Sequence, residues 1–388
     1  MTDTGFLATA RRELRRLTSR RIYFCTMIFV PLAVTLFFVS LLGEGLPLKI
    51  PSAVVDLDHS TMSRAVTRSL NSTELIDVTQ KLESYTDAME SVRRGEIFGF
   101  FIIPSNFEAD ALGGRTPTLE YFSNMTFFVP GTLAYKGFKT VAVGTAGTMV
   151  RTTLVSAGAD PENVGALIQP LNLDVHPVGN PWTNYSIYLS PSFCAGLLAL
   201  MIMLVTCFAI TTEIKYGTSA EWLATARGRM SVALAGKLLP HFVIWWVVTM
   251  CVLSILFGFC HFPLNGSLVA LLVAATMFVV ASLAMAVIFC CIVPNPRLSL
   301  IMSALIGILS FSLAAFSFPV QSMYGFIAIL SYLLPVRYFF LIYCNVALNG
   351  AEVWYSRFYY LALAIFPFVA CLSLSRLKKA CLNPVYVP

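Results

Sequence analysis

The stretch LLPHFVIWWVVTMCVLSILFGFCHFPLNGSLVALLVAATMFVVASLAMAVIFCCIVPNP, residues 238–296, contains no Asp, Glu, Lys or Arg. A helix that crosses a bilayer needs about 20 mostly apolar residues, so this stretch is long enough for two crossings. Its middle, HFPLNG at 261–266, combines Pro, Asn and Gly and favours a turn. The stretch therefore predicts two transmembrane helices joined by a short loop.

Other uncharged runs predict similar helices elsewhere in the chain. They are residues 22–43, 193–210, 298–316 and 358–375. Because the run at 22–43 is longer than the apolar core of a signal peptide, we expect an uncleaved membrane anchor. Together these runs predict a polytopic α-helical membrane protein with six transmembrane helices.

The composition agrees with a membrane protein. Of the 388 residues, 57% are hydrophobic and 12% are charged, whereas soluble proteins are about one quarter charged. This excludes a soluble enzyme with a single core and a disordered chain. No nucleic-acid binding is expected, because the net charge of +6 comes from Lys and Arg clustered at the ends of the spans.

The Lys and Arg residues also predict the orientation. They gather before residue 22, in the loop 213–237, at Arg297 and in the tail 378–388. Such residues favour the cytoplasmic side of a membrane, and six spans place all four segments on one side. We therefore expect both termini in the cytoplasm.

Residues 44–190, between the first two predicted spans, read as an inserted extracytoplasmic α/β domain. Strand-like segments such as 53–57 and 97–103 alternate with helical segments such as 84–94. None of the ten cysteines lies between residues 43 and 190, so no disulfide framework is expected. No Cys/His cluster has zinc spacing, and we predict no metal site.

The five-helix membrane domain, residues 191–377, includes one apolar segment that is too interrupted for a simple span. Phe318 and Pro319 break residues 317–357 near the start, and Pro335 breaks them again. We interpret 317–357 as a re-entrant outer segment of short helices, because non-helical backbone at membrane depth needs protein or water around it.

Residues 1–21 are expected to form an amphipathic interfacial helix. The apolar residues fall on one stripe at helical spacing: Phe6, Leu7, Ala10, Leu14 and Leu17. The positive charges occupy the remaining surface: Arg11, Arg12, Arg15 and Arg16. Such a helix would lie on the inner leaflet with its guanidinium groups on membrane lipid phosphates.

The loop 213–237 contains the signals of a short, rigid helix. Thr218 and Glu221 have the spacing of a capping box, in which each side chain satisfies a free backbone N–H of the first turn. Gly228 stands where a left-handed residue would end the helix. A helix of about two turns is therefore expected on the cytoplasmic surface.

The same helix contains an apolar pair, Trp222 and Leu223. Such a pair is unusual in a solvated loop, and we predict that it is exposed and docks a protein partner. The alternative is that Trp222 packs at the lipid interface, as tryptophan often does.

No pattern in the sequence predicts catalysis or a bound cofactor. The nearest approach to a phosphate-binding loop is Gly236-Lys237, but positions 231 and 238 are Ser and Leu. His241 follows one turn later, and we interpret it as a capped or interface histidine. No charged residue falls in the middle of a predicted span, so the energy for any transport is expected to come from a partner.

The chain resembles the permeases of the ABC-2 family, which are transmembrane subunits of bacterial ATP-binding-cassette exporters. The resemblance lies in the order and spacing of short motifs: 54–58, 95–104, Glu213, Gly217-Thr218, Glu221, Gly236-Lys237, Phe318-Pro319 and Pro335. It covers essentially the whole chain and is closest to the branch with a large external domain between the first two helices.

The resemblance implies a homodimer or heterodimer of permeases with two cytoplasmic ABC ATPase subunits, which would bind ATP and Mg. It implies that residues 6–20 are a connecting helix and 218–226 a coupling helix. The ATPase-docking residues would then be Glu213, Thr218, Glu221, Trp222 and Leu223. Trp222 departs from the aliphatic residues more usual there.

The apolar spans favour a hydrophobic or amphipathic substrate moved out of the cytoplasm or inner leaflet, and the external domain could dock a periplasmic adaptor. The alternative function is a membrane-anchored receptor or surface factor whose α/β domain binds a ligand. A co-purifying ATPase would distinguish the two. A membrane enzyme is disfavoured, because no nucleophile–base or metal constellation is present.

Overall fold

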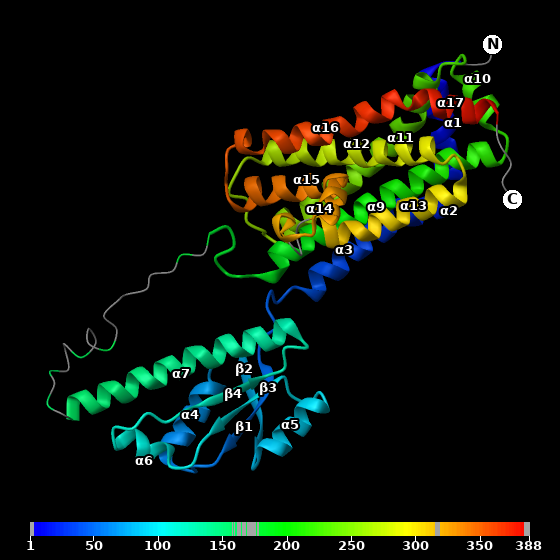
Figure 1. The fold of residues 1–388 in the computed structure, drawn as a ribbon. Helices are drawn as coiled ribbons and strands as arrows, with labels where there is room; N and C mark the ends of the chain where they lie inside the picture. The colour runs from blue at the N-terminus through cyan, green and yellow to red at the C-terminus, as the bar shows by residue number, and fades with distance from the viewer. Residues whose placement is uncertain are drawn as a thin grey trace. The chain divides into compact units, whose positions relative to one another are not determined.

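The computed structural model describes residues 4–156, 178–314 and 319–383, together with Gly158, Asp160, Val164, Ile168 and His176. The chain divides into two compact units (Figure 1). One unit combines residues 1–45 with 177–388 and is helical, and the other consists of residues 46–176 and contains a β-sheet.

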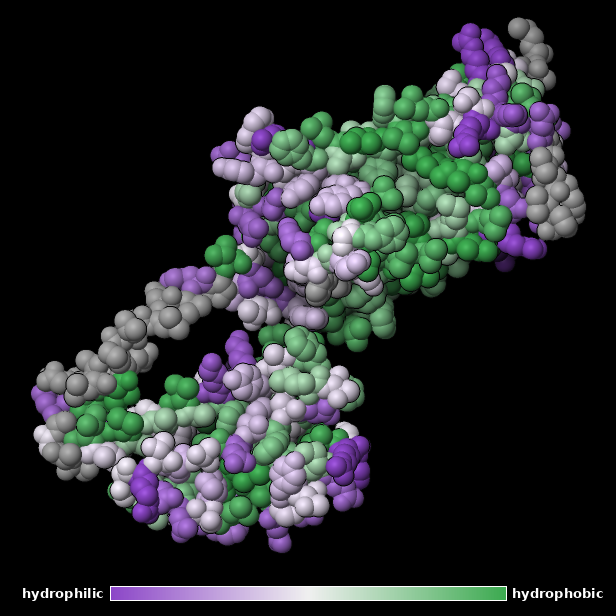
Figure 2. Space-filling view, viewed as in Figure 1, coloured by the Kyte–Doolittle hydropathy of each residue, from purple (hydrophilic) through white to green (hydrophobic). Residues whose placement is uncertain are grey.

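Among the described residues of the helical unit, six segments are long and apolar enough to cross a membrane, as the uncharged runs predict. They are Arg21–Leu41, Tyr185–Lys215, Met230–Phe259, Leu268–Ile292, Pro296–Leu313 and Val353–Leu382. Figure 2 shows apolar side chains along the flank of this unit and polar side chains gathered at its two ends. The chain is therefore built as a multi-pass helical membrane protein.

The elements of these spans have the following bounds. The first span joins α2 (Arg21–Phe24) to α3 (Val30–Leu41) through a π-helical turn. The next four contain α9 (Tyr185–Lys215), α11 (Met230–Leu253), α12 (Leu268–Ile292) and α13 (Pro296–Leu313). The last contains α16 (Arg357–Leu372) and α17 (Leu374–Leu382).

Two predicted boundaries fall inside helices. Residue 190 does not separate a domain from the membrane helices, because α9 already begins at Tyr185, where the Asn184 side chain accepts a hydrogen bond from the Ser186 N–H. Proline 191 lies inside this helix. The tail expected from residue 378 is helical up to Leu382.

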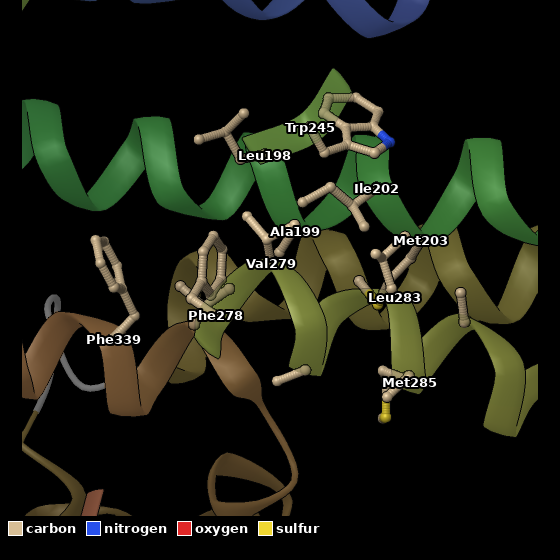
Figure 3. Close-up of a cluster of buried hydrophobic side chains, with 14 of the residues drawn as sticks. Leu198, Ala199, Ile202, Met203, Trp245, Phe278, Val279, Leu283, Met285 and Phe339 are labelled. Atoms are coloured by element: carbon tan, nitrogen blue, oxygen red, sulfur yellow. The ribbon is translucent and has the colours of Figure 1, made fainter. Parts of the chain in front are cut away.

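The centre of the helical unit is formed by α9 and α12, which have the most buried spans. Figure 3 shows Leu198 and Ile202 of α9 beside Phe278 and Val279 of α12. Glycine allows the helices to approach closely, as is common between membrane helices. A Cβ added to Gly307 of α13 would lie only 2.3 Å from a Leu200 methyl carbon of α9.

The segment predicted to be re-entrant forms two short helices, α14 (Gly325–Tyr332) and α15 (Pro335–Ile342). They meet at an angle of 81°, with Pro335 in the first turn of α15. Pro319 precedes a short 3-10 turn, whereas Phe318 lies outside the described residues. Such a bend suits a re-entrant loop or a broken span, so the re-entrant path stays a prediction.

Residues 46–176 form an α/β unit on a four-stranded sheet of order β2-β1-β3-β4. The strands are β1 (Ile50–Asp56), β2 (Ile76–Leu82), β3 (Gly99–Ile103) and β4 (Glu120–Ser123). β1 is parallel to β2 and β3, and β4 is antiparallel to β3.

Helices cover both faces of this sheet because each strand alternates apolar side chains between its faces. Val54 packs with α4 (Thr61–Asn71) and α7 (Phe128–Ser156), and α6 (Phe107–Leu112) contributes Phe107 to the same core. Ala53 and Val55 pack on the opposite face against α5 (Tyr85–Arg93).

Candidate functional site

The candidate site lies at the end of the helical unit where α9 ends and α11 begins. Two short elements pack there: α1 (Phe6–Ser19) and α10 (Ser219–Thr225) (Figure 1). Backbone and side-chain hydrogen bonds join them, from Gly5 N to the Thr225 carbonyl at 2.7 Å and from Arg227 to Thr4 Oγ1 at 3.2 Å. The Ser219 hydroxyl also donates to the Cys381 carbonyl, which connects α10 to α17.

Helix α1 packs tightly on α11 through a glycine. A Cβ at Gly236 would lie 2.7 Å from the Thr9 Cβ and 2.9 Å from the Phe6 carbonyl oxygen, so only glycine allows this approach. The buried residues of α1 form one face: Thr9, Ala10, Glu13 and Leu17.

This packing corrects the predicted interfacial helix. Ala10 and Leu17 face protein rather than lipid, whereas Leu7 and Leu14 are exposed. The four arginines divide in the same way: Arg11 and Arg15 are exposed, but Arg12 and Arg16 turn inward to a carboxylate. The prediction that all four lie on lipid phosphates is wrong, because the sequence could not show that a buried acid was within reach of two of them.

That carboxylate belongs to Glu213, near the end of α9. Arg12 donates to both of its oxygens at 2.9 Å, and Arg16 donates to Oε1 at 2.7 Å. Lys237 of α11 donates to Oε1 at 3.0 Å, and the Thr218 hydroxyl donates to Oε2. Hydrogen bonds to Glu213 therefore hold α1, α11 and the start of α10 against the end of α9.

A second buried carboxylate, Glu13 of α1, shares the same lysine. The Lys237 ammonium lies 2.5 Å from Glu13 Oε2, and His241 Nε2 lies 3.1 Å from Oε1. Lys237 is 1% exposed, and its ammonium also lies 5.0 Å from the ring of Trp222. The lysine thus bridges Glu13 and Glu213, which belong to segments far apart in the sequence.

Such a network is stable only as a complete set. Burying a charge costs several kcal/mol, which is recovered only if the partners and their hydrogen bonds are in place. Burial by itself raises the pKa of Glu13, but the nearby Lys237 and His241 outweigh it and lower this pKa from 4.5 to about 2. Glu13 is therefore ionised at neutral pH and holds α1 to α11 as a charge.

The low pKa of Glu13 predicts an acid-dependent stability difference. The stability that ionised Glu13 contributes is present above pH 4.5 and is lost as the pH falls from 4.5 towards 2. The melting temperatures of the wild type and Glu13→Gln should therefore differ at pH 7 and converge below pH 4.5. Thermal unfolding between pH 7 and 3 measures this, with the exposed Glu221→Gln as control. A constant difference across this range would contradict the ion pair.

Helix α10 differs from its prediction because its aromatic residue is inside the protein. Trp222 is fully buried and Leu223 is 4% exposed. The indole Nε1 donates to the Ala233 carbonyl of α11 at 3.1 Å. The prediction that Trp222 and Leu223 form an exposed docking pair is therefore wrong: their apolar surface is used to fix α10 to the helical unit.

The start of α10 is also held differently. Thr218 precedes the helix, but its side chain makes no capping hydrogen bond and donates to Glu213 instead. Glu221 lies exposed in the first turn. The predicted capping box is therefore not formed, because a buried carboxylate is a stronger acceptor for the threonine hydroxyl.

The end of α10 has the predicted type of stop, displaced by one residue. Arg227, with φ of 56°, is the first left-handed residue after the helix, and Gly228 follows it with φ of 71°. The Arg227 N–H donates to the Ala224 carbonyl and the Gly228 N–H donates to that of Leu223. This is the Schellman arrangement, with Arg227 rather than Gly228 in the C′ position.

The network at this end pairs its charged side chains with one another. Its carboxylates are neutralised by cations, so neither is placed as a free base. Within the described ranges, no three His, Cys, Asp or Glu side chains gather closely enough to hold a metal ion.

The family comparison agrees with this architecture. The profile of the ABC-2 family transporter proteins matches residues 20–373. The chain belongs to the ABC-2 transporter family. No curated protein matches it. The match includes all of α9, α10 and α11, whereas α1 precedes it.

In this ABC-2 transporter, three of the residues predicted to dock an ATPase belong to the buried cluster formed by Lys237 and Glu213. They are Glu213, Thr218 and Trp222. Of the remaining two, Leu223 is buried and Glu221 is at the surface. The structure thus makes most of the predicted set internal to the transporter.

Sequence reasoning missed Glu13, named Lys237 only as part of the Gly236-Lys237 motif, and left His241 as a structural residue. Two weak signals were present: Glu13 is the single acid among the arginines of residues 6–21, and Lys237 and His241 stand one helical turn apart. Neither signal reveals the pairing, because 224 positions separate Glu13 from Lys237.

Proposed function

We propose that this ABC-2 transporter is the permease subunit of an exporter driven by a separate cytoplasmic ABC ATPase that binds ATP and Mg. The observation that carries the proposal is the buried network of Glu13, Glu213 and Lys237, which joins α1, α9 and α11 at one end of the spans. Without a phosphate-binding loop in the sequence, the energy source is expected in another subunit.

The ATPase would bind the outer surface of α10. Ala220, Glu221 and Ala224 are exposed on this helix, and Tyr216 just before it is 66% exposed. The small side chains of Ala220 and Ala224 leave room on α10 for a partner's side chains. Glu221 remains a proposed docking residue, whereas Trp222 and Leu223 hold α10 in place from the protein interior.

Force on α10 would reach the spans through two rigid connections. Trp222 is bonded to the Ala233 carbonyl, which couples α10 to α11. Thr218 and Lys237 bind Glu213, which couples the same helix to α9 and to α1 through Arg12. A displacement of α10 therefore moves three elements together rather than bending a loop.

The positive residues at this end support its cytoplasmic location, with both termini in the cytoplasm of a bacterial inner membrane. The α/β unit would then be extracytoplasmic, where it could contact a periplasmic adaptor. The apolar spans favour a hydrophobic or amphipathic substrate. As in the family resemblance, the permease would act as a homodimer or heterodimer.

The proposal is tested by placing a large charged side chain on α10. Ala224→Arg should leave the fold intact, because Ala224 is exposed, and should reduce ATPase recovery about tenfold or more, as for a residue at the centre of an interface. The tagged chain is purified from native membranes and Mg-ATP hydrolysis per permease is measured.

Ser69→Arg, at an exposed position of α4 in the α/β unit, is the matched control and should retain full hydrolysis. The permease stripped of partners should hydrolyse no ATP. Undiminished hydrolysis by Ala224→Arg would refute docking at α10, and hydrolysis by the stripped chain would refute the separate ATPase.

A further inference from the structure

A buried arginine lies at the bend between α14 and α15. Arg337 is the third residue of α15 and only 7% exposed. Its Nη1 donates to the Ser331 hydroxyl at 2.9 Å, and that hydroxyl donates to the Leu313 carbonyl at 2.5 Å. The ring of Tyr332 lies 4.4 Å from the guanidinium carbon.

This cation has no negative partner in the part of the chain that the structure describes. No carboxylate within the described ranges forms an ion pair with Arg337, and its buried Nε has no hydrogen-bond partner. The start of a helix carries partial positive charge, so the position of Arg337 in the first turn of α15 adds to the imbalance. Because a buried charge is costly unless it is paired, an anion is expected here.

The level of Arg337 along the spans indicates the kind of anion. Ser331 binds the carbonyl of Leu313, the last residue of α13. Helix α13 has 18 residues and is about 27 Å long, close to the roughly 30 Å thickness of the hydrocarbon layer. Arg337 therefore lies near one end of a membrane span, at the level where lipid phosphates begin.

Helix α14 provides an apolar surface beside this level. Phe326 is 67% exposed, Ile329 61% and Leu333 52%. Tyr332 is half exposed, and its ring stacks on Arg337. The tyrosine ring therefore lies between the buried guanidinium and the surface. A ligand that combines an anionic group with long apolar chains suits both features.

We propose that the Arg337 guanidinium, held in place by Ser331, binds the phosphate of an anionic phospholipid whose acyl chains lie along α14. The Tyr332 ring moves aside or packs against the headgroup as the phosphate enters. The site lies outside the α1–α9–α11 network, so it does not depend on the proposed coupling to an ATPase.

The test measures how lipid stabilises the purified full-length chain. Dioleoylphosphatidylglycerol is titrated into the protein in mild detergent, and the melting temperature and the retained lipid, by native mass spectrometry, are recorded. Wild type should gain stability and retain this lipid. Arg337→Gln should bind it about tenfold or more weakly, as expected for loss of a charge-assisted hydrogen bond, and Arg337→Lys should be intermediate.

Arg357→Gln is the matched control, because Arg357 stacks on Trp354 and Phe358 near the start of α16 and should retain the lipid. If Arg337→Gln does not fold, Ser331→Ala keeps the charge and should still weaken retention. Equal lipid binding by wild type and the Arg337 or Ser331 variants would overturn the site. Inorganic phosphate that stabilises wild type as strongly as the lipid would overturn the lipid as its occupant.

Discussion

Replacing Lys237 by methionine is expected to destabilise the transporter by about 3–5 kcal/mol, as removal of one partner from a buried ion pair typically does. Methionine fills a similar volume but leaves Glu13 without its nearest cation and removes one from Glu213. Helix α1 should then separate from α11. Thermal unfolding of the purified chain measures the loss, and transport at equal protein levels should fall with it.

Two further variants separate this mechanism from a general effect of losing a lysine. Lys215→Met removes an exposed lysine from the last position of α9 and should change little. Adding Glu13→Gln to Lys237→Met removes one of the uncompensated carboxylates and should recover part of the stability. If the double variant is less stable than Lys237→Met, the two side chains do not act as a pair.

Trp222→Ala is the second substitution with a large expected effect. It removes a fully buried indole, its 3.1 Å hydrogen bond to the Ala233 carbonyl and its contact with Lys237. Deletion of a buried aromatic side chain typically costs about 3–5 kcal/mol. We expect a lower melting temperature of the isolated permease, and proteolysis near residues 216–229 should become faster because α10 loses its anchor.

The control is Trp182→Ala, where the indole is 66% exposed and less buried surface is lost. The measurement also distinguishes burial from docking. If Trp222→Ala left the isolated permease fully stable and only reduced ATPase recovery, Trp222 would be a docking residue as the sequence suggests. A loss of stability without any partner present supports the buried position.

The sequence by itself determined the membrane architecture. Six uncharged runs became six apolar helices, because a long run without charge has few ways to satisfy its backbone other than a helix in lipid. The stop of α10 was also readable to within one residue, since the turn that ends a helix depends on its own neighbours. These are local properties, set by composition and short spacings.

Only the tertiary structure decided the roles of the residues at the α1–α9–α11 junction. An amphipathic stripe shows that one face of a helix will be covered, but it does not show whether lipid or protein covers it. The stripe of α1 therefore predicts contact with lipid, whereas in the structure the face that contains Glu13 packs on Gly236 and Lys237. Trp222 looked exposed for the same reason. Pairing of charges and burial of aromatics depend on which distant segments meet, and that information is a property of the folded packing rather than of any short stretch.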